Sequence, residues 1–330
     1  MMLSDCWYCG KEISGYVFRI AGNDCDINCA NEQITRAKDL LGRLNSEIDS
    51  FVGFGLGFEK PEFFWYIFVD DPGMLQYLKD EFSAAQLGFS IYPIVIEIPN
   101  QMEPEMIPAI PDKFIMGGTS IGHLKASTTG TLGGVLRMGE KKYVVSTASV
   151  LAPAGAMIGD KVVHPSRPDS PRRGVILGRL VVISRMAPNS SNDLDAAIAE
   201  IDPEILTTPR VKNIGVPSEA SEPHIGMSVR KSGRTTGFTE GKILCTDVRM
   251  KRIHDGRLYY INDHFIVMGE TGNFAEPGDE GSLVMDNRNA VTGMVELAIH
   301  GMAVCSRGTI LLERFGFVPP ECFEPFEDEM

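Results

Sequence analysis

The sequence predicts a mainly β protein with an α+β N-terminal part. Two observations support this fold class. After Gly117 the chain consists of short apolar runs broken by glycine turns, without helical patterns between them, which is typical of a sandwich or a pair of barrels. Before Ile98, aromatic and apolar runs that look like strands flank one segment with a helical spacing of apolar residues, and this indicates a small α/β module.

The composition places the chain among soluble globular proteins. Its 330 residues suggest about two domains. The composition, with 43% hydrophobic and 23% charged residues, excludes a disordered chain, a collagen-like fibre and a bundle of membrane spans. The net charge of -13 repels phosphate backbones, so we expect no nucleic acid among the partners. Arg249, Lys251 and Arg252 could form a local basic patch, although such a trio is more often a solvated strand end.

Targeting and compartment signals are weak. The first residues lack the basic and apolar regions of a secretory signal, and the most apolar run, Phe63 to Val69, is far shorter than the ~20 residues of a spanning helix. We therefore expect no membrane association. Seven cysteines is an odd number without an even framework of pairs, which indicates a reducing, cytoplasmic compartment.

Residues 1–45 form a cysteine-rich segment that resembles a treble-clef zinc finger. Cys6, Cys9, Cys25 and Cys29 follow the spacing C-x2-C-x15-C-x3-C, and the second pair opens a helical pattern from 30 to 44. Four thiolates predict a structural Zn²⁺ without an open catalytic position. The last spacing is x3 rather than the usual x2, so Asp24 or Asp26 could replace one of the second pair, and four buried thiols without metal are the alternative.

Residues 46–112 comprise the small α/β module and a connector. We expect strands over 51–58, 63–69 and 90–98 and a helix over 74–87, whose apolar residues recur at helical spacing. The connector carries Pro99, Pro104, Pro108 and Pro111, which suits a semi-rigid linker.

Residues 113–318 are expected to form the β-rich part, and residues 319–330 an acidic tail. The strand-like runs include 130–137, 142–146, 174–178, 196–199, 228–230, 242–244, 264–268, 282–285 and 291–295. The tail mixes acidic residues with two phenylalanines, so it is either a docking peptide or a frayed end.

Three segments of this part resemble the catalytic segments of chymotrypsin-fold serine peptidases. They are KYVVSTASVLA at 142–152, NDLDAAIA at 192–199 and EPGDEGSLV at 276–284. Together with GTSIGH at 118–123 and VRKSGRTTG at 229–237, they are similar in order and spacing to the narrow-leaf-type, trypsin-like peptidases of bacteria and plants. The resemblance covers about residues 50 to 318 and implies a trypsin-like double β-barrel.

The same resemblance implies a degenerate catalytic triad. Ser149 stands where the family has its histidine base, Asp195 stands at the aspartate position, and Glu280 replaces the serine nucleophile. Gly278, Asp279 and Glu280 would form the oxyanion-hole loop. The chemistry needs a nucleophile and a base in contact with it, and both side chains are replaced. The sequence therefore predicts a pseudoprotease, with a rearranged or partner-completed endopeptidase as the alternative.

Three further expectations concern the site and its partners. Ser282 lies two positions beyond the nucleophile position, so its hydroxyl should point elsewhere in the loop. The Glu280 carboxylate is expected to fold into the former oxyanion hole and accept the N–H groups of Gly278 and Glu280. The cleft would then bind a peptide or protein partner by strand addition, and zinc would be the only cofactor.

Overall fold

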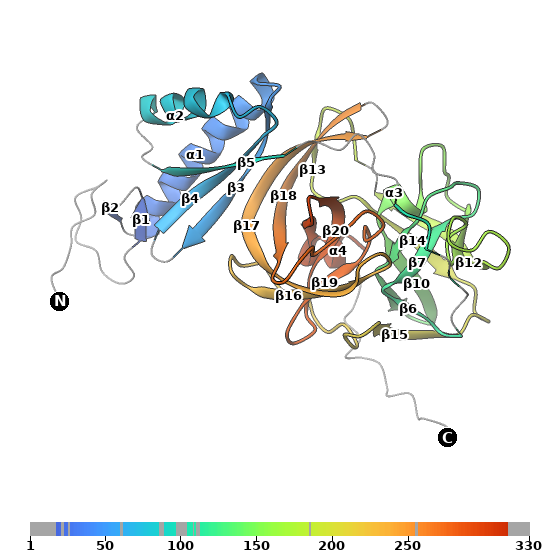
Figure 1. Ribbon diagram of the computed structural model, residues 1–330. Coiled ribbons are helices and arrows are strands. Elements are labelled where there is room, and N and C mark those ends of the chain that lie inside the picture. The colour runs from blue at the N-terminus through green and yellow to red at the C-terminus, as the bar shows by residue number, and fades with distance from the viewer. Residues whose placement is uncertain are drawn as a thin grey trace.

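The computed structural model describes residues 18–20, 23–25, 27–59, 62–85, 89–96, 104–107, 109, 113–184, 186–254 and 257–315. Three units lie in a row: an N-terminal α/β module, the barrel formed by the last strands, and the barrel formed by the middle of the chain (Figure 1). The predicted mainly β fold with an α+β N-terminal part is confirmed.

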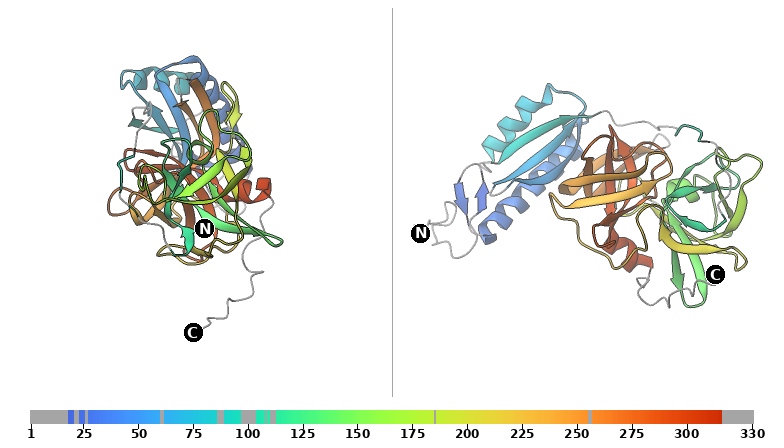
Figure 2. Two further views of the ribbon diagram at one scale, coloured as in Figure 1. Left: turned by 90° about the vertical axis from the view of Figure 1, so that its right-hand side faces the viewer. Right: turned by 60° about the horizontal axis from the view of Figure 1, so that its bottom comes forward.

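The N-terminal module is a sheet covered by helices on one face (Figures 1 and 2). Strand β4 pairs antiparallel with β3, and its other edge pairs in parallel with both β1 and β5. The helical and strand patterns of the sequence are present, but the second helix ends at Ala84 and the last strand at Val95. The elements are β1 (Phe18–Ile20), β2 (Asn23–Cys25), α1 (Ile27–Glu47), β3 (Phe51–Glu59), β4 (Glu62–Val69), α2 (Met74–Ala84) and β5 (Ser90–Val95).

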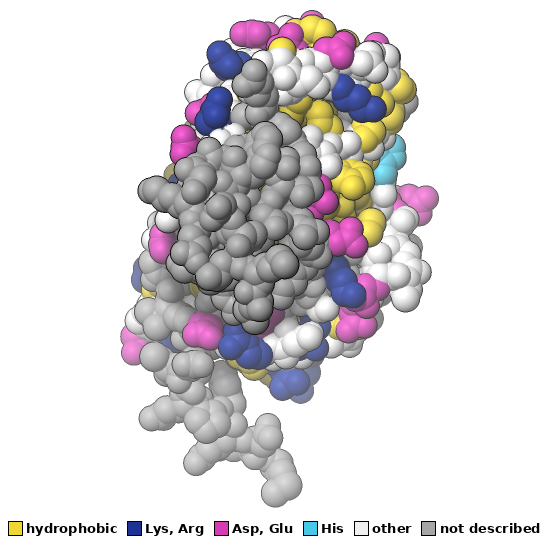
Figure 3. All heavy atoms as spheres, turned by 90° about the vertical axis from the view of Figure 1, so that its left-hand side faces the viewer, with side chains coloured by type: hydrophobic (Ala, Val, Ile, Leu, Met, Phe, Trp, Pro, Cys, Tyr) yellow, Lys and Arg dark blue, Asp and Glu magenta, His cyan; other side chains and the backbone are white. Residues whose placement is uncertain are grey.

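The core of this module is aromatic and aliphatic. Phe54 and Trp65 pack edge to face with 5.6 Å between ring centroids, and Leu41 of α1 and Leu78 of α2 are fully buried in the same cluster. On the outer surface, hydrophobic side chains gather beside charged residues of both signs (Figure 3). The large exposed hydrophobic residues of the module are Tyr77, Tyr92 and Val95.

The module is joined to the neighbouring barrel through one continuous sheet. Strand β17 (Gly237–His254) pairs antiparallel with β3. Glycines alternate along β3 because neighbouring atoms leave no room for side chains: a Cβ at Gly53 would lie 2.6 Å from Met250 Cγ, and one at Gly55 would lie 2.8 Å from Cys245 Sγ. The glycine-rich pattern thus permits close packing of the module against the barrel.

The first barrel is a seven-stranded sheet in the order β8-β7-β11-β12-β14-β10-β9. It closes because β8 and β9 follow one another in the chain, and the Gly133 N–H donates to the Val145 carbonyl at 2.8 Å. Strands β6 (Ile115–Gly117) and β15 (Thr207–Val211) form a separate parallel pair. The barrel strands are β7 (Thr119–His123), β8 (Gly130–Leu132), β9 (Gly134–Met138), β10 (Lys141–Ser146), β11 (Lys161–His164), β12 (Val175–Ser184) and β14 (Ala196–Ile201).

The second barrel runs in the order β18-β21-β20-β19-β16-β17, and it closes through pairing of β17 with β18. Its strands besides β17 are β16 (Ser228–Gly233), β18 (Arg257–Gly269), β19 (Leu283–Asp286), β20 (Val291–Ile299) and β21 (Met302–Arg307). The short strand β13 (Ser191–Asn192) pairs with β18, and helix α4 (Gly308–Phe315) follows β21. Among the described residues, no helix is both long and apolar enough to cross a membrane.

The suggested basic patch or solvated strand end on β17 is wrong for two of its three residues. Lys251 is 6% exposed and donates to the carbonyls of Ile48 and Asp49 at 2.6 and 3.2 Å. Arg252 is 7% exposed and faces a buried carboxylate. Both cations have buried partners: Lys251 donates to carbonyls of the α/β module, and Arg252 forms an ion pair with Asp195.

Candidate functional site

The three triad positions lie in connections between barrel strands. Ser149 belongs to the short helix α3 (Ala148–Leu151), Asp195 immediately precedes β14, and Glu280 lies in the loop before β19. Gly130 lies between α3 and that loop, where there is no room for a side chain. A Cβ at this position would lie 3.1 Å from Val150 Cγ1 and 3.0 Å from the Glu280 carbonyl oxygen. The structure therefore places Ser149 and Asp195 at one pocket and the loop of Glu280 beside the helix that carries Ser149.

Asp195 faces Ser149 from within the protein. The residue is only 3% exposed, and the N–H and the hydroxyl of Ser149 favour the ionised form of its carboxylate by lowering its pKa. The Ser149 hydroxyl also lies 3.0 Å from Thr147 Oγ1. Serine at this position thus keeps contact with the aspartate but offers no group that could take a proton near neutral pH.

Behind Asp195 lies a buried cluster of charged residues. The Asp195 N–H donates to Glu296 Oε1 at 2.9 Å, and Glu296 Oε2 lies 2.9 Å from His264 Nε2. Arg252 Nη1 lies 3.6 Å from Asp195 Oδ2. Burial is the largest influence and opposes ionisation of Asp195. Arg252 counteracts it and Glu296 adds repulsion, so that the pKa of Asp195 is raised to about 6.

Sequence reasoning missed this cluster, because neither His264 nor Glu296 belongs to one of the motifs on which the resemblance rests. One signal was available. Glu296 is the only charged residue in the strand sequence VTGMVELAI, which is otherwise apolar apart from Thr292. A charge in such a strand is expected to be buried and paired. Glu296 is indeed paired, with His264. The Glu296 carboxylate raises the pKa of His264, although burial acts in the opposite direction.

The Glu280 loop is a tight turn that holds its own carboxylate. Gly278 and Gly281 have φ angles of +100° and +94°, which favour glycine. The Gly278 N–H donates to Glu280 Oε2 at 2.7 Å, and the N–H of Glu280 also stabilises the ionised carboxylate. This is the contact that the sequence hypothesis required. Burial is the largest influence and raises the pKa of Glu280 above its usual value, which the two N–H groups partly oppose.

Asp279 fixes this loop to the turn after β16. Its Oδ1 accepts the N–H groups of Thr235 and Thr236 at 2.8 and 3.2 Å, and its Oδ2 accepts the Thr236 hydroxyl at 2.7 Å and the Glu276 N–H at 3.1 Å. Lys231 Nζ lies 3.3 Å from Oδ2, and both side chains of this ion pair are 0% exposed. The loop shape therefore depends on Asp279, independently of the residue at position 280.

Ser282 takes no part in the open site. Its hydroxyl donates to the Asp279 carbonyl at 2.6 Å, and the residue is fully buried. A serine in this arrangement serves the local turn and is not exposed to a substrate. The hydroxyl thus points into the loop, as its distance from position 280 in the sequence suggested.

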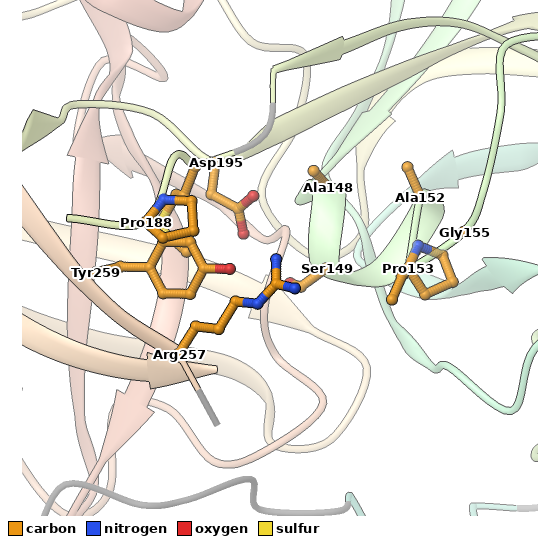
Figure 4. A pocket seen from close by; sticks show the side chains of 11 residues that line it. Ala148, Ser149, Ala152, Pro153, Gly155, Pro188, Asp195, Arg257 and Tyr259 are labelled. Carbon is orange, nitrogen blue, oxygen red and sulfur yellow. The ribbon is translucent and has the colours of Figure 1, made fainter. Parts of the chain in front are cut away.

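A pocket of 380 Å³ opens beside Ser149 and Asp195 (Figure 4). In Figure 4 the guanidinium of Arg257 extends toward Ser149, and the Tyr259 hydroxyl points into the same region. Small and apolar residues form much of the remaining wall. The lining residues are Ala148, Ser149, Ala152, Pro153, Ala154, Gly155, Met186, Pro188, Asp195, Arg257 and Tyr259.

The predicted zinc ligands lie mostly outside the described residues. Cys6 and Cys9 are not among them, and of Cys25 only the backbone at the end of β2 is described. Cys29 lies in the first turn of α1 and packs, partly buried, against the module core. Within the described ranges, no three or more His, Cys, Asp or Glu side chains form a group that could hold a metal ion.

The raised pKa of Asp195 gives a testable pH dependence. A carboxyl group with a folded-state pKa above its unfolded value favours folding below about pH 4, and this contribution disappears as the pH rises through about 6. The Asp195→Asn variant should therefore gain stability relative to wild type between pH 4 and 7, on the order of 2 kcal/mol. Denaturant unfolding across this pH range measures the difference.

Asp193 provides the control of opposite sign. Hydrogen bonds from Arg314, at 2.8 and 2.6 Å, lower the pKa of this carboxyl group. Its stabilising effect is present at neutral pH and lost as the pH falls through its folded-state pKa. Asp193→Asn should lose stability at pH 7 but not at pH 2. Equal pH slopes for the two variants would contradict the assignment of a raised pKa to Asp195.

Comparison with known proteins agrees with this architecture. The family model of peptidase family S64 matches residues 183–322, which is less than half of the chain. The search of curated proteins found no match. The chain therefore has a trypsin-like serine peptidase fold. This is indicated by the match to a peptidase family, by the two closed barrels and by the loops at their junction.

Several solved structures are similar to the chain at low sequence identity. Thermobifida fusca protease A is 18% identical, with a TM-score of 0.46, and Cellulomonas bogoriensis chymotrypsin is 15% identical, with a TM-score of 0.45. A homologue of α-lytic protease, N4, is 16% identical with a TM-score of 0.47. Each similarity covers 62% of this chain and 97% of the other.

Proposed function

We propose that this protein is an inactive homologue of trypsin-like serine peptidases that binds an extended peptide segment of a partner protein in the cleft between its barrels. The observation that carries the proposal is the Glu280 carboxylate, which accepts the Gly278 N–H at 2.7 Å. In the resemblance to peptidases, position 280 belongs to the nucleophile, and these N–H groups would stabilise the oxyanion of the reaction. Here a side chain of the protein itself occupies them.

The residues at the site support the absence of hydrolysis. Ser149 offers no base, and a carboxylate that holds two backbone N–H groups is poorly placed to attack a peptide bond. Loss of either the nucleophile or the base alone costs about six orders of magnitude in rate in a related type of enzyme. Both functions are missing at these positions.

The shape of the site supports binding. The loop that carries Glu280 is fixed by the buried Asp279–Lys231 pair, and an open pocket adjoins Ser149. A rigid cleft lowers the entropy cost of ordering a bound segment. Strand addition along the cleft would supply main-chain hydrogen bonds, and the pocket would take one side chain of the peptide.

Fluorescence anisotropy with a library of labelled extended peptides tests the binding. Ala154 is exposed at the pocket, so Ala154→Trp should obstruct it without disturbing the core, and Ala154→Ser is the matched control. We expect some peptides to bind wild type and the serine variant equally well. The same peptides should bind the tryptophan variant at least about tenfold more weakly, because the indole would displace the peptide side chain from the pocket. Equal binding to all three proteins, or none to wild type, would refute a peptide-binding cleft.

The alternative function is a trypsin-like endopeptidase with rearranged or partner-completed machinery. It would use the same cleft, with Ser149 or a partner's side chain in a new role. Its distinguishing property is cleavage, so a bound peptide recovered with a new terminus would favour it. A bound peptide recovered intact favours the scaffold function.

We also propose a structural zinc ion held by Cys6, Cys9, Cys25 and Cys29. The support is their spacing and the position of Cys29 in the first turn of α1. Metal analysis of the purified chain is expected to find about one zinc per molecule, and Cys6→Ser with Cys9→Ser should remove it. Zinc retained by that variant would exclude this ligand set.

A further inference from the structure

We infer that the pocket beside Ser149 selects an acidic side chain of the bound peptide, whose carboxylate pairs with the guanidinium of Arg257. The inference rests on the proposed peptide-binding function and names the chemistry of the side chain that this site takes. It follows from the position of Arg257 on a fixed strand, from the state of its charge in the described part of the chain, and from the pairing of the carboxylates behind the pocket.

The geometry of β18 directs Arg257 into the pocket. Arg257 and Tyr259 lie two positions apart on this strand, so their side chains leave the same face of the sheet, and both line the pocket. The start of the strand pairs with the end of β17, and the Leu258 carbonyl accepts the Asn189 N–H at 3.1 Å. Figure 4 shows the guanidinium extending from this strand toward Ser149.

The loop beside this strand is fixed as well. Met186 and Pro188 of the pocket wall belong to it, and the buried amide of Asn192 holds it in place. The Asn192 side chain accepts the Ala187 N–H at 2.7 Å and donates to the Tyr260 carbonyl of β18 at 3.0 Å. The loop is therefore tied to the strand that carries the arginine, and a pocket with such walls is preorganised for a ligand.

In the described part of the chain, the charge of Arg257 has no partner. Its guanidinium forms no hydrogen bond and no ion pair with the residues there. Asp195 is the other charged residue among the described lining residues, and it is paired with Arg252, whose Nη1 lies 3.6 Å from Oδ2. A ligand carboxylate would supply the missing counter-charge, and the fork of N–H groups on a guanidinium matches its two oxygens.

The carboxylates behind the pocket are each engaged with a cation. Asp195 is 3% exposed, and the charge of Arg252 offsets its own. Glu296 lies 2.9 Å from His264, whose pKa it raises. These pairs reduce the repulsion of an acidic ligand, whereas Arg257 at the open side attracts it and repels a basic one.

The pocket has the size for one side chain of this kind. Its volume is 380 Å³, which is at the lower end of the range of about 300–1,000 Å³ for small-ligand sites. Ala148 and Ala152 form small, apolar parts of the wall. Such a wall accommodates the methylene groups of a glutamate while its carboxylate reaches the guanidinium.

The test uses the α-amide of N-acetylglutamic acid as the glutamate probe, because it carries the side-chain carboxylate without charged termini. Binding to the full chain is measured by ligand-observed NMR titration at low salt. We expect saturable binding to wild type. The amide of N-acetylglutamine, which has nearly the same size without the charge, should bind about fivefold or more weakly. Arg257→Gln should weaken binding of the glutamate probe by a similar factor and leave the glutamine probe unaffected.

Two further variants separate pairing in the pocket from general attraction to the protein. Arg172→Gln removes an exposed arginine that is not a lining residue, and it should leave the binding of both probes unchanged. Arg257→Glu should reverse the preference, so that the amide of Nα-acetyl-lysine binds this variant about fivefold or more tightly than wild type. Thermal unfolding, recorded beforehand, shows that each variant is folded.

Several results would overturn the inference. They are equal binding of the glutamate and glutamine probes, equal binding of the glutamate probe to wild type and Arg257→Gln, and no saturable binding to wild type. N-Acetylglutamine with a free α-carboxylate distinguishes the source of the charge. If it binds as tightly as the glutamate probe, the pocket takes a chain terminus and not an acidic side chain.

A peptide arm distinguishes the inference from the proposed function. Peptides selected by the cleft should contain an acidic residue, and its replacement by the corresponding amide should weaken binding to wild type by about fivefold or more. Selected peptides that keep their affinity after this replacement would overturn the inference and leave the peptide-binding function standing. If no peptide binds while the glutamate probe binds through Arg257, the peptide-binding function fails and the preference of the pocket for a carboxylate stands.

Discussion

The Ser149→His, Glu280→Ser double variant is expected to react with a fluorophosphonate serine-hydrolase probe about a thousandfold faster than the wild-type chain, or more. The substitutions supply a base beside Asp195 and a nucleophile on a loop whose N–H groups are then released from the Glu280 carboxylate. Intact-protein mass spectrometry measures the rate of labelling, and peptide mapping locates the label.

The single variants and the aspartate serve as controls. Either substitution alone should leave labelling within about tenfold of wild type, because a nucleophile without its base is weakly reactive. Adding Asp195→Ala to the double variant should lower the rate by several orders of magnitude. If the double variant stays as unreactive as wild type while folded, the loop at 278–280 does not form an oxyanion hole.

Asp279→Ala is expected to destabilise the protein by about 3–5 kcal/mol, because it leaves the ammonium of Lys231 buried without its charged partner. It also removes the acceptor of the Thr235, Thr236 and Glu276 hydrogen bonds. Denaturant unfolding followed by intrinsic fluorescence measures the change in the free energy of unfolding.

The matched control is Asp193→Ala, which also removes an aspartate from an ion pair. The side chains of Asp193 and its partner Arg314 are 39% and 40% exposed, so the loss should be at most about 1 kcal/mol. Equal effects of the two substitutions would show that Asp279 is not a structural anchor. The conformation of the loop at Gly278 and Gly281 would then need another explanation.

Much of the fold was predictable because local patterns carry it. Aromatic and apolar runs located β3 and β4, helical spacing located α2, and glycine turns marked the barrel strands. Element ends were less certain: α2 ends at Ala84, and apolar spacing alone does not locate the C-cap at Ala85. Long-range closure of the two barrels could not be derived from periodicity and came from the resemblance alone.

In the candidate site, too, local motifs were predictable from the sequence and long-range contacts were not. Positions 149, 195 and 280 were identified because their neighbours in sequence form motifs, and the turn geometry at Gly278 follows from the same motif. Glu296 and His264 were missed because their partnership joins residues 32 positions apart in sequence, on strands whose pairing depends on the whole barrel. Arg252 was assigned to the surface, since no sequence rule reports that it faces the buried carboxylate of Asp195, 57 positions away in the chain.

The most direct test of the central claim is whether the wild-type chain cuts protein at all. We would incubate it with a denatured proteome and identify new peptide termini by mass spectrometry, beside Ser149→Ala and the Ser149→His, Glu280→Ser double variant. The expected result is no new termini from wild type or Ser149→Ala and reproducible ones from the double variant. New termini from wild type that disappear with Ser149→Ala would show a working catalytic serine and contradict the inactive, peptide-binding function.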